Sequence, residues 1–161
     1  MRKVYLFLSL LLVAVWATAQ VKSEIKITTS KEYGATLDMW PKSTSKEDAI
    51  SIDWGDGELK EYNIDPNGMP YFTKVSGRIV GDTIRIFTKL VNLECSEGNV
   101  TSLTLIDQPL LTNLLVNDNE LTSDKCILDG ATNLKVVNLS KNQLTIFDMR
   151  PFEKLEMFSA N

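Results

Sequence analysis

The stretch Leu90-Val-Asn-Leu93-Glu-Cys95 recurs three times further along the chain. Its counterparts are Leu111-Thr-Asn-Leu114-Leu-Val116, Leu134-Lys-Val-Val137-Asn-Leu139 and Leu155-Glu-Met-Phe158-Ser-Ala160, whose starts lie 21, 23 and 21 residues apart. Apolar residues repeated at this period are typical of stacked units that each contain a short strand and a return segment. Residues 90–161 are therefore predicted to form three such units and an incomplete fourth.

The bend after each strand is also periodic. Asn119 and Asn142 occupy the same place in successive units, and Gly98 occupies it in the first. Backbone groups turn inward at such a bend, and an amide side chain can supply both the donors and the acceptors that they need. Asn119 and Asn142 are predicted to form a structural ladder. The break at Gly98 indicates that the preceding region covers that end of the stack.

Residues 20–89 show a different rhythm, with apolar and polar residues in alternation between turns. The alternating sets are Ile25 and Ile27; Leu37 and Met39; Ile50, Ile52 and Trp54; and Ile84 and Ile86. This alternation predicts half-buried strands, and Gly55-Asp-Gly57 and Gly81-Asp82 are expected to supply positive-φ residues for tight hairpins. The chain is predicted to be mainly β, with a small antiparallel, β-sandwich-like module ahead of the repeats.

Residues 1–19 have the features of a secretory signal peptide. The basic pair Arg2-Lys3 precedes an apolar run from Val4 to Trp16, and Ala17-Thr-Ala19 offers a cleavage site before Gln20. The run is shorter than the roughly 20 residues that a membrane-spanning helix needs. The chain is expected to be exported, with no membrane span after cleavage.

Composition removes several classes of function. The 17 basic and 21 acidic residues give a net charge of -4, which disfavours nucleic acid and anionic membranes as partners. The chain has no histidine, so histidine-dependent triads and histidine-ligated zinc are excluded. Cys95 and Cys126 stand in otherwise apolar columns, which favours buried free thiols over a single disulfide. No cofactor is expected.

The acidic turn around Gly55 allows a sharper hypothesis. Asp53, Asp56 and Glu58 offer carboxylates for a calcium ion or for a glycosidase pair. Calcium takes six to eight oxygen ligands, and no cleft is predicted around these residues. A plain hairpin turn is the favoured interpretation, and no metal or catalytic residue is predicted.

The segments Leu93-x-Cys95-Ser96-x-Gly98-x-Val100 and Val137-x-Leu139-Ser140-x-Asn142-Gln-Leu144 resemble the leucine-rich repeats of bacterial secreted and cell-surface proteins, the internalin-like group. The Ile52-Asp-Trp-Gly-Asp-Gly57 segment resembles the small β domain that precedes such repeats in secreted proteins of Gram-negative bacteria and, more weakly, the aspartate-glycine turn of PKD-type β-sandwiches. This resemblance implies a solenoid with a parallel concave sheet, a secreted, periplasmic or cell-surface location, and non-catalytic binding of a protein or, less favoured, a glycan. Asp124 departs from the pattern, because leucine is usual there.

Alternation along the four repeat strands identifies the side chains that would point outward on the concave sheet. They are Asn92, Glu94, Ser96, Asn113, Leu115, Asn117, Val136, Asn138, Ser140, Met157 and Ser159. Leu115, Val136 and Met157 are the candidate apolar anchors for a partner, although scattered exposed apolar residues are also ordinary. These columns contain no aromatic residue, so a glycan would have to stack on Trp40, Tyr62 or Tyr71, for which core packing is the alternative.

Three classes of function remain. The favoured one is an exported binding protein whose ligand, a protein or a glycan, the sequence does not identify. The alternative is a structural or surface-assembly segment, because the fourth unit reaches Asn161 without a polar cap and its edge strand could pair with another chain or with further repeats. A secreted glycan-active enzyme is remote, since the sequence offers no nucleophile-base pair, metal frame or phosphate loop.

Overall fold

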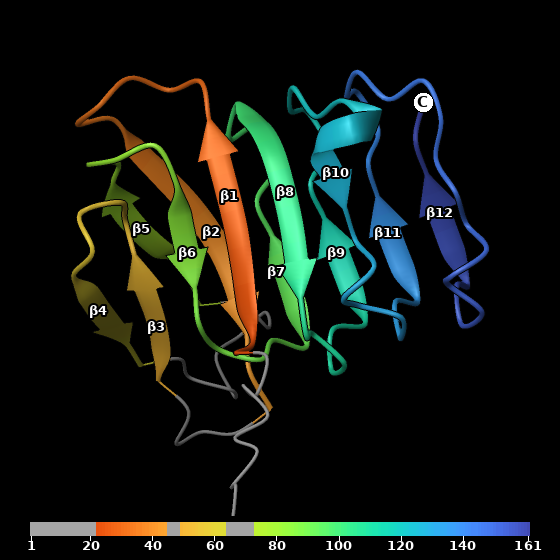
Figure 1. Ribbon diagram of the computed structural model, residues 1–161, viewed down its shortest axis with the longest axis horizontal. Coiled ribbons are helices and arrows are strands. Elements are labelled where there is room, and N and C mark those ends of the chain that lie inside the picture. Colours follow the sequence, from red (N-terminus) through yellow and green to blue (C-terminus); the bar gives the residue numbers. More distant parts are fainter. Residues whose placement is uncertain (1–21, 45–48, 64–72) are drawn as a thin grey trace, which may run out of the picture.

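The computed structural model describes residues 22–44, 49–63 and 73–161, so the predicted signal peptide lies outside the described residues. The described chain is mainly β and contains twelve strands (Figure 1). One turn of 3-10 helix, η1 (Ser123–Lys125), is its only helical element, and the described ranges contain no α-helix. The predicted fold class is confirmed at this level.

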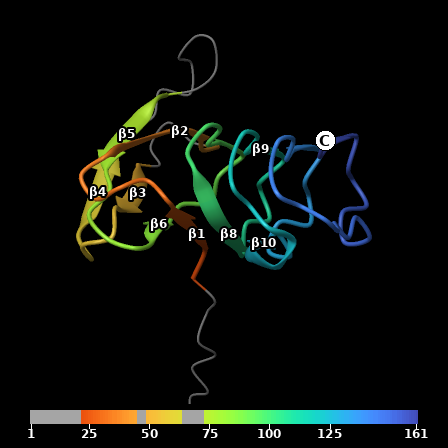
Figure 2. The same ribbon diagram turned by 90° about the horizontal axis from the view of Figure 1, so that it is seen from above.

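Six strands come from the N-terminal region: β1 (Glu24–Thr29), β2 (Thr36–Lys42), β3 (Ile50–Asp53), β4 (Leu59–Tyr62), β5 (Val75–Arg78) and β6 (Ile84–Ile86). Six more follow: β7 (Asn92–Glu94), β8 (Val100–Ile106), β9 (Asn113–Leu115), β10 (Cys126–Ile127), β11 (Val136–Asn138) and β12 (Met157–Ser159). Together they form two six-stranded sheets on opposite sides of one buried cluster (Figures 1 and 2).

The first sheet has the order β10-β8-β1-β6-β3-β4. All its neighbouring strands are antiparallel except β10 and β8, which run parallel. Strand β1 lies between β6 and β8, so the N-terminal strand joins the N-terminal region to the repeat region. The pairing of β1 with β8 extends over the whole of β1 and includes one irregularity after Thr28.

The second sheet has the order β12-β11-β9-β7-β2-β5. Strands β7, β9, β11 and β12 are parallel, and each is the strand of one of the four sequence frames. Their central residues, Leu93, Leu114, Val137 and Phe158, are aligned in register across the sheet. Strand β2 then pairs antiparallel with β7 and continues the sheet to β5.

The apolar positions predicted from alternation form the core. Ile25, Ile27, Leu37, Met39, Ile50, Ile52, Trp54, Ile84 and Ile86 are all buried, as are Leu93, Leu114 and Val137 in the parallel strands. Both sheets contribute to this one cluster, and Phe158 is only partly buried because it lies in the last strand. Isoleucine, valine and leucine suit these strands because their side chains pack on a pleated, half-buried surface.

The expectation of a separate antiparallel, sandwich-like module is not met. Both sheets are mixed, because each joins antiparallel strands from residues 20–89 to strands from residues 90–161. The physical reason is hydrogen bonding at the sheet edge. Strands β1 and β2 pair with β8 and β7 of the first repeat unit, whose edge backbone groups would otherwise have no partners.

The acidic turn after β3 organises the backbone. The Asp53 carboxylate accepts hydrogen bonds from the backbone N–H groups of Gly55 and Gly57, at 2.8 and 3.0 Å. Both glycines have positive φ, as predicted, but Gly81 does not. Gly81 instead lies against Gly55, where a Cβ on either residue would overlap the backbone of the other.

The two cysteines are free thiols. Cys95 is buried and Cys126 is partly buried, and burial raises the pKa of these thiols to about 12 and about 11. Protonated thiols are poor nucleophiles, so neither group is suited to covalent chemistry near neutral pH.

Candidate functional site

The predicted binding residues lie together on the outer face of the second sheet. Two rows of side chains cross it in register. One row contains Lys42, Asn92, Asn113, Val136 and Met157, and the other contains Trp40, Glu94, Leu115, Asn138 and Ser159. We call this surface the outer face. Because its strands are paired residue for residue, neighbouring side chains in each row are within contact distance of one another.

The three candidate anchors are neighbours on the outer face. Val136 is directly opposite Asn113 on one side and Met157 on the other, while Leu115 is diagonal to Val136. Met157 is 63% exposed, whereas Leu115 and Val136 are half-buried. These three side chains form a small apolar area at the β9 to β12 end of the face.

Asn92 was predicted to point to solvent, but it is only 3% exposed. Its side-chain amide donates to the Trp40 carbonyl at 3.4 Å, and its side-chain oxygen is buried without a hydrogen-bond partner in the described structure. The reason for its burial is its position beside β2, which continues the sheet past β7. Asn92 is therefore not available as a contact residue.

Polar side chains follow the parallel strands and bond one another across the units. The Asn117 side-chain oxygen accepts from the Ser96 hydroxyl at 2.9 Å and from the Asn138 amide at 3.1 Å. The hydroxyls of Ser140 and Ser159 share a further hydrogen bond. These contacts order the polar side of the outer face before any partner arrives.

The amides at the bends are bonded to backbone groups. Asn119 accepts from the N–H groups of Gly98 and Val100, both at 2.9 Å, and donates to the carbonyls of Cys95 and Val116. Asn142 makes the equivalent contacts one unit later: it accepts from Leu121 N–H and donates to the carbonyls of Val116 and Leu139. At Gly98, where the ladder has no amide, a Cβ would lie 2.9 Å from Leu37 Cδ1 of β2.

Sequence reasoning missed the contribution of β2 to the outer face. Because Leu37 and Met39 are buried, the alternate residues Asp38, Trp40 and Lys42 point outward. Trp40 is directly opposite Glu94 and therefore places an aromatic ring in a row that the repeat strands alone leave without one. Alternation in residues 36–42 was visible in the sequence, but the pairing of this strand with β7 was not.

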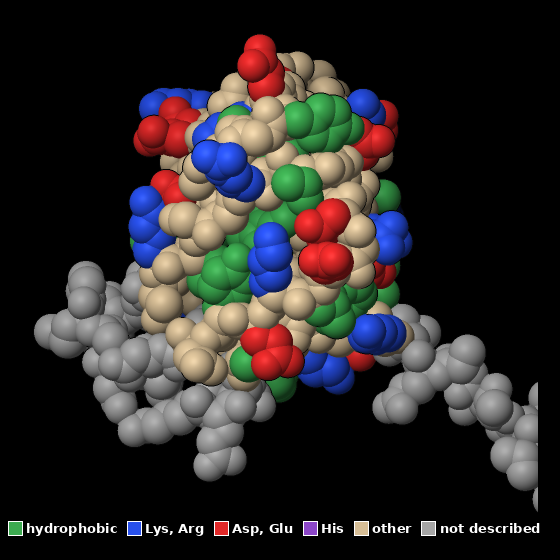
Figure 3. Space-filling view, turned by 90° about the vertical axis from the view of Figure 1, so that its left-hand side faces the viewer, with side chains coloured by type: hydrophobic (Ala, Val, Ile, Leu, Met, Phe, Trp, Pro, Cys, Tyr) green, Lys and Arg blue, Asp and Glu red, His purple; other side chains and the backbone are tan. Residues whose placement is uncertain are grey.

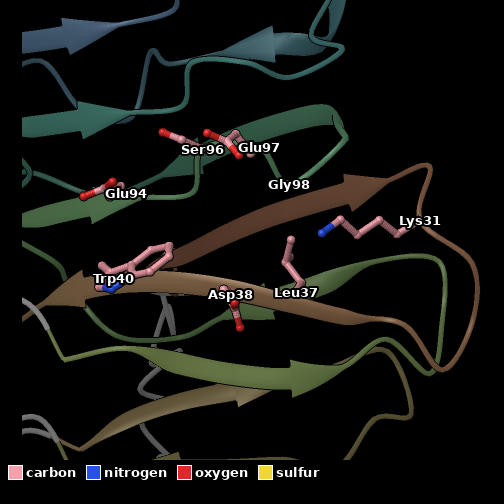
Figure 4. A pocket seen from close by; sticks show the side chains of 8 residues that line it. All are labelled: Lys31, Leu37, Asp38, Trp40, Glu94, Ser96, Glu97 and Gly98. Atoms are coloured by element: carbon pink, nitrogen blue, oxygen red, sulfur yellow. The ribbon is translucent and has the colours of Figure 1, made fainter.

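A groove of about 280 Å³ lies where β2 and β7 separate (Figure 4). Its lining comes from β2, from the end of β7 and the bend that follows it, and from Lys31 in the loop before β2. The lining residues are Lys31, Leu37, Asp38, Trp40, Glu94, Ser96, Glu97 and Gly98. We call this the β2/β7 groove.

Some of the charges at the β2/β7 groove are already paired. Asp38 accepts from Lys74 at 2.7 Å and from the Ser76 hydroxyl at 2.6 Å, and these two donors hold the pKa of its carboxyl below the usual value. Lys31 donates to the Thr36 carbonyl at 3.4 Å. Glu94 and Glu97 have no hydrogen bond or ion pair to their carboxylates in the described part of the chain.

The other candidates from the sequence have structural roles or lie outside the described ranges. Tyr62 accepts a hydrogen bond from the buried Trp54 ring at 2.8 Å, and Tyr71 is outside the described residues. Asp56 accepts from Glu58 N–H, and Asp53 is bonded to the two glycines of the turn. Within residues 22–44, 49–63 and 73–161, no group of three acidic or cysteine side chains is placed to hold a metal ion.

The two ends of the sheets are also exposed. At the β12 end, Ile146 and Met149 are exposed apolar residues, and Phe147 stacks on Phe152 and Phe158 with ring centroids 5.8 and 4.9 Å apart. The opposite end, seen in Figure 3, mixes hydrophobic and charged side chains. Its exposed hydrophobic residues include Leu59 of the edge strand β4.

The chain shows no match to a protein-family model, a curated protein or a solved structure. Among the described residues, no helix has the length and apolarity that crossing a membrane would require.

Proposed function

We propose that this chain is an exported, non-catalytic binding protein, in which residues 90–161 form a leucine-rich-repeat solenoid and the outer face binds another protein. The observation that carries the proposal is the in-register outer face itself, built by β7, β9, β11 and β12 and widened by β2. Its apolar anchors and preset polar groups suit a macromolecular surface better than a small molecule.

The solenoid part of the proposal is supported by three features that recur at the same period. These are the parallel strands, the aligned central apolar residues, and the backbone-bonded amides of Asn119 and Asn142. A unit of this size cannot bury its own apolar face, so the stacking of neighbours supplies the core. The resemblance to the internalin-like repeats of bacterial secreted and cell-surface proteins supports the same architecture and an exported location.

Protein is favoured over glycan as the ligand because of the anchors. Leu115, Val136 and Met157 offer aliphatic surface, whose burial by a partner contributes about 25 cal/mol for each Å². Glycans are held chiefly by aromatic rings, and Trp40 is the one aromatic residue in the two rows that cross the outer face. Asn117 and Asn138, whose side-chain amides bond each other, support the non-catalytic part of the proposal, because an amide does not act as a general acid or base near neutral pH.

Replacement of the anchors tests the proposal. Leu115→Asp and Met157→Asp should each abolish capture of a partner from an extract of the producing cells, because each places a charge in the apolar area. Ile127→Asp is the matched control: Ile127 is 44% exposed but belongs to β10 of the other sheet, so capture should persist. Circular dichroism checks that all three variants fold, and retained capture by folded Leu115→Asp and Met157→Asp would reject the outer face.

Export has its own test. If residues 1–19 are a signal peptide, chain secreted by a bacterial host should begin at Gln20, as determined by mass spectrometry. Changing Ala17 and Ala19 to bulky residues should block cleavage, because the processing site requires small side chains. Intact residues 1–19 on the mature exported protein would contradict the proposed processing.

Assembly through β12 is a second candidate function. Met157 N–H bonds to Lys135 at 2.9 Å and the Ser159 carbonyl accepts from Leu139 at 2.7 Å, so the backbones of these two residues face β11. By alternation, the N–H groups of Phe158 and Ala160 point away from β11, along the sheet edge. Such an edge can pair with another chain, and exposed Ile146 and Met149 lie in the return segment of the preceding unit, whose Phe147 stacks on Phe158 of β12.

Light scattering distinguishes assembly from the monomer. Edge pairing predicts an average mass that rises with protein concentration and a reduced rise in Ala160→Pro, which removes an outward N–H without altering the groups that face β11. A mass that stays monomeric over the whole concentration range would exclude this function for the chain.

A further inference from the structure

The β2/β7 groove exists because β2 changes partner along its length. Residues Trp40–Lys42 of β2 pair with β7, whereas Thr36–Met39 pair with β5 only. Strand β7 ends at Glu94, and the chain then bends through Ser96 and Gly98. The side of β2 that faces β7 is therefore open beside residues 36–39, and the groove lies there (Figure 4).

The open side of β2 presents backbone groups to the groove. Ile79 N–H bonds to the Ala35 carbonyl at 3.0 Å, so by alternation Leu37 and Met39 bond toward β5. Thr36 and Asp38 then turn their backbone groups toward the β7 side. The Lys31 ammonium on the Thr36 carbonyl shows that this side accepts a donor, and Asp38 offers one further N–H and one C=O to an extended chain.

The side chains at the groove leave negative charge unbalanced. Asp38 is neutralised by Lys74, and Lys31 is the one cation among the lining residues. Glu94 and Glu97 lie on the opposite side of the groove, and their carboxylates form no hydrogen bond or ion pair in the described structure, although the charge of Glu97 acts on Lys141 at longer range. A cationic ligand group would balance this charge.

The Trp40 ring also favours a positive group at the groove. Its ring is partly exposed at the groove and lies opposite Glu94 in the strand pairing. Lys74 approaches the ring from the β5 side, with its ammonium 5.8 Å from the ring centroid. An aromatic ring attracts cations over its face, so Trp40 and Glu94 together favour a positive group.

We infer that the β2/β7 groove binds an arginine or lysine side chain carried on an extended segment of the partner protein. This inference rests on the proposed protein-binding function and identifies one part of the partner. The backbone of Asp38 recognises the extended segment, while Glu94, Glu97 and Trp40 recognise its positive side chain. The charge complementarity and the open strand edge argue for a basic peptide instead of a neutral glycan.

Amide chemical shifts in NMR spectra test the inference on the full chain. The probe is the heptapeptide Thr-Val-Thr-Arg-Thr-Val-Thr, and its matched control contains citrulline, which has the shape of arginine without the charge. The arginine peptide should shift the amide signals of Asp38, Glu94 and Ser96 and the indole signal of Trp40. The citrulline peptide should bind roughly tenfold more weakly, because it lacks both the ion pairs and the cation-ring contact.

Variants assign the effect to the groove. Glu94→Gln combined with Glu97→Gln should weaken binding of the arginine peptide about tenfold, and Trp40→Leu should weaken it several-fold. Glu153→Gln removes one exposed carboxylate outside the groove and should leave the affinity unchanged. Added salt should weaken binding to the native chain, since partly exposed charges are screened.

The outcomes separate this inference from the wider proposal. Equal binding of the two peptides, no shift at the groove, or stronger binding of a neutral oligosaccharide there would overturn the inference. If the arginine peptide binds the groove as expected but Leu115→Asp still captures the partner, the proposal that the apolar anchors of the outer face bind the partner is rejected. The inference about the groove is then retained. If the arginine peptide does not bind the groove while Leu115→Asp abolishes capture, the proposed function is retained and the inference about the groove is rejected.

Discussion

Asn119 connects two repeat units through one side chain. Its oxygen accepts from Gly98 and Val100, and its amide nitrogen donates to the carbonyls of Cys95 and Val116. Asn119 is only 7% exposed, so water is not available as a substitute partner. A buried polar group left without a partner costs about 1–3 kcal/mol, so the loss of this amide leaves several such costs at one bend.

Asn119→Ala should therefore lower the free energy of unfolding by at least about 3 kcal/mol. Asn142→Ala should cost less, because Asn142 is half-buried and accepts a single backbone N–H. Asn133→Ala is the control, since its exposed amide donates to Pro109 on the surface. Urea unfolding gives the order; equal losses for all three variants would contradict the structural ladder.

Cys95 predicts a pH dependence of stability. Burial raises the pKa of its thiol from 9.0 to about 12, so the folded state keeps the proton when the unfolded state has lost it. The contribution is fully present below pH 9 and is lost as the pH rises toward 12. Urea unfolding across this range should show a smaller decline in Cys95→Val than in the native chain. An identical decline in both would show that the thiol makes no such contribution.

Residues in the left-handed region mark the bends in a way the sequence did not reveal. Glu97, Asp118 and Lys141 occupy the place just before Gly98, Asn119 and Asn142, and all three have φ near +55° (56°, 54° and 55°). Asp tolerates this region better than Lys or Glu, and glycine is the usual signal for it. Because Glu97 and Lys141 are not residue types that favour turns, the sequence gave no reason to predict a left-handed conformation at these bends.

At the scale of the element, β5 depends on a close approach to the core. The Trp54 ring lies against Gly77 of β5 and donates a hydrogen bond to Tyr62 of β4, so one buried side chain contacts both sheets. A Cβ on Gly77 would overlap the ring. The absence of a side chain at Gly77 is therefore what allows the two sheets to meet around Trp54.

Gly77→Ala should destabilise the protein by about 3 kcal/mol and change the fluorescence of Trp54, because the ring must move. Gly57→Ala is the matched control: Gly57 has φ of +81° and nothing within 4 Å of an added Cβ, so only the backbone cost of about 1 kcal/mol applies. A Gly77→Ala variant with native stability and fluorescence would show that the ring is not packed as described.

Elements were easier to predict than their partners. Alternation identified the buried sides of β1, β2, β3 and β6, and the repeated frame identified β7, β9, β11 and β12, because both patterns are local in sequence. The pairing of β1 with β8 and of β2 with β7 joins segments about fifty or more residues apart, for which periodicity carries no information. For that reason the sequence missed the mixed sheets, the burial of Asn92, and the place of Trp40 in the outer face.

At the scale of the whole molecule, the N-terminal strands and the repeats form one continuous structure. Strands β1 and β2 satisfy the edges of the first unit in both sheets, and Leu37 of β2 fills the space beside Gly98. The outer face consequently runs from the β2/β7 groove at one end to Met157 at the other. A partner that spans this surface would contact charged, polar and apolar regions in that order.

Site-specific photo-crosslinking tests directly whether the outer face binds the partner. A benzophenone amino acid is placed at Asn138, in the middle of the outer face, or at Thr104 of β8, which points outward from the other sheet between buried Leu103 and Leu105. Capture from the extract followed by irradiation should give a crosslinked partner from position 138 and none from position 104. A crosslinked partner from position 104 alone would contradict the assignment of binding to the outer face.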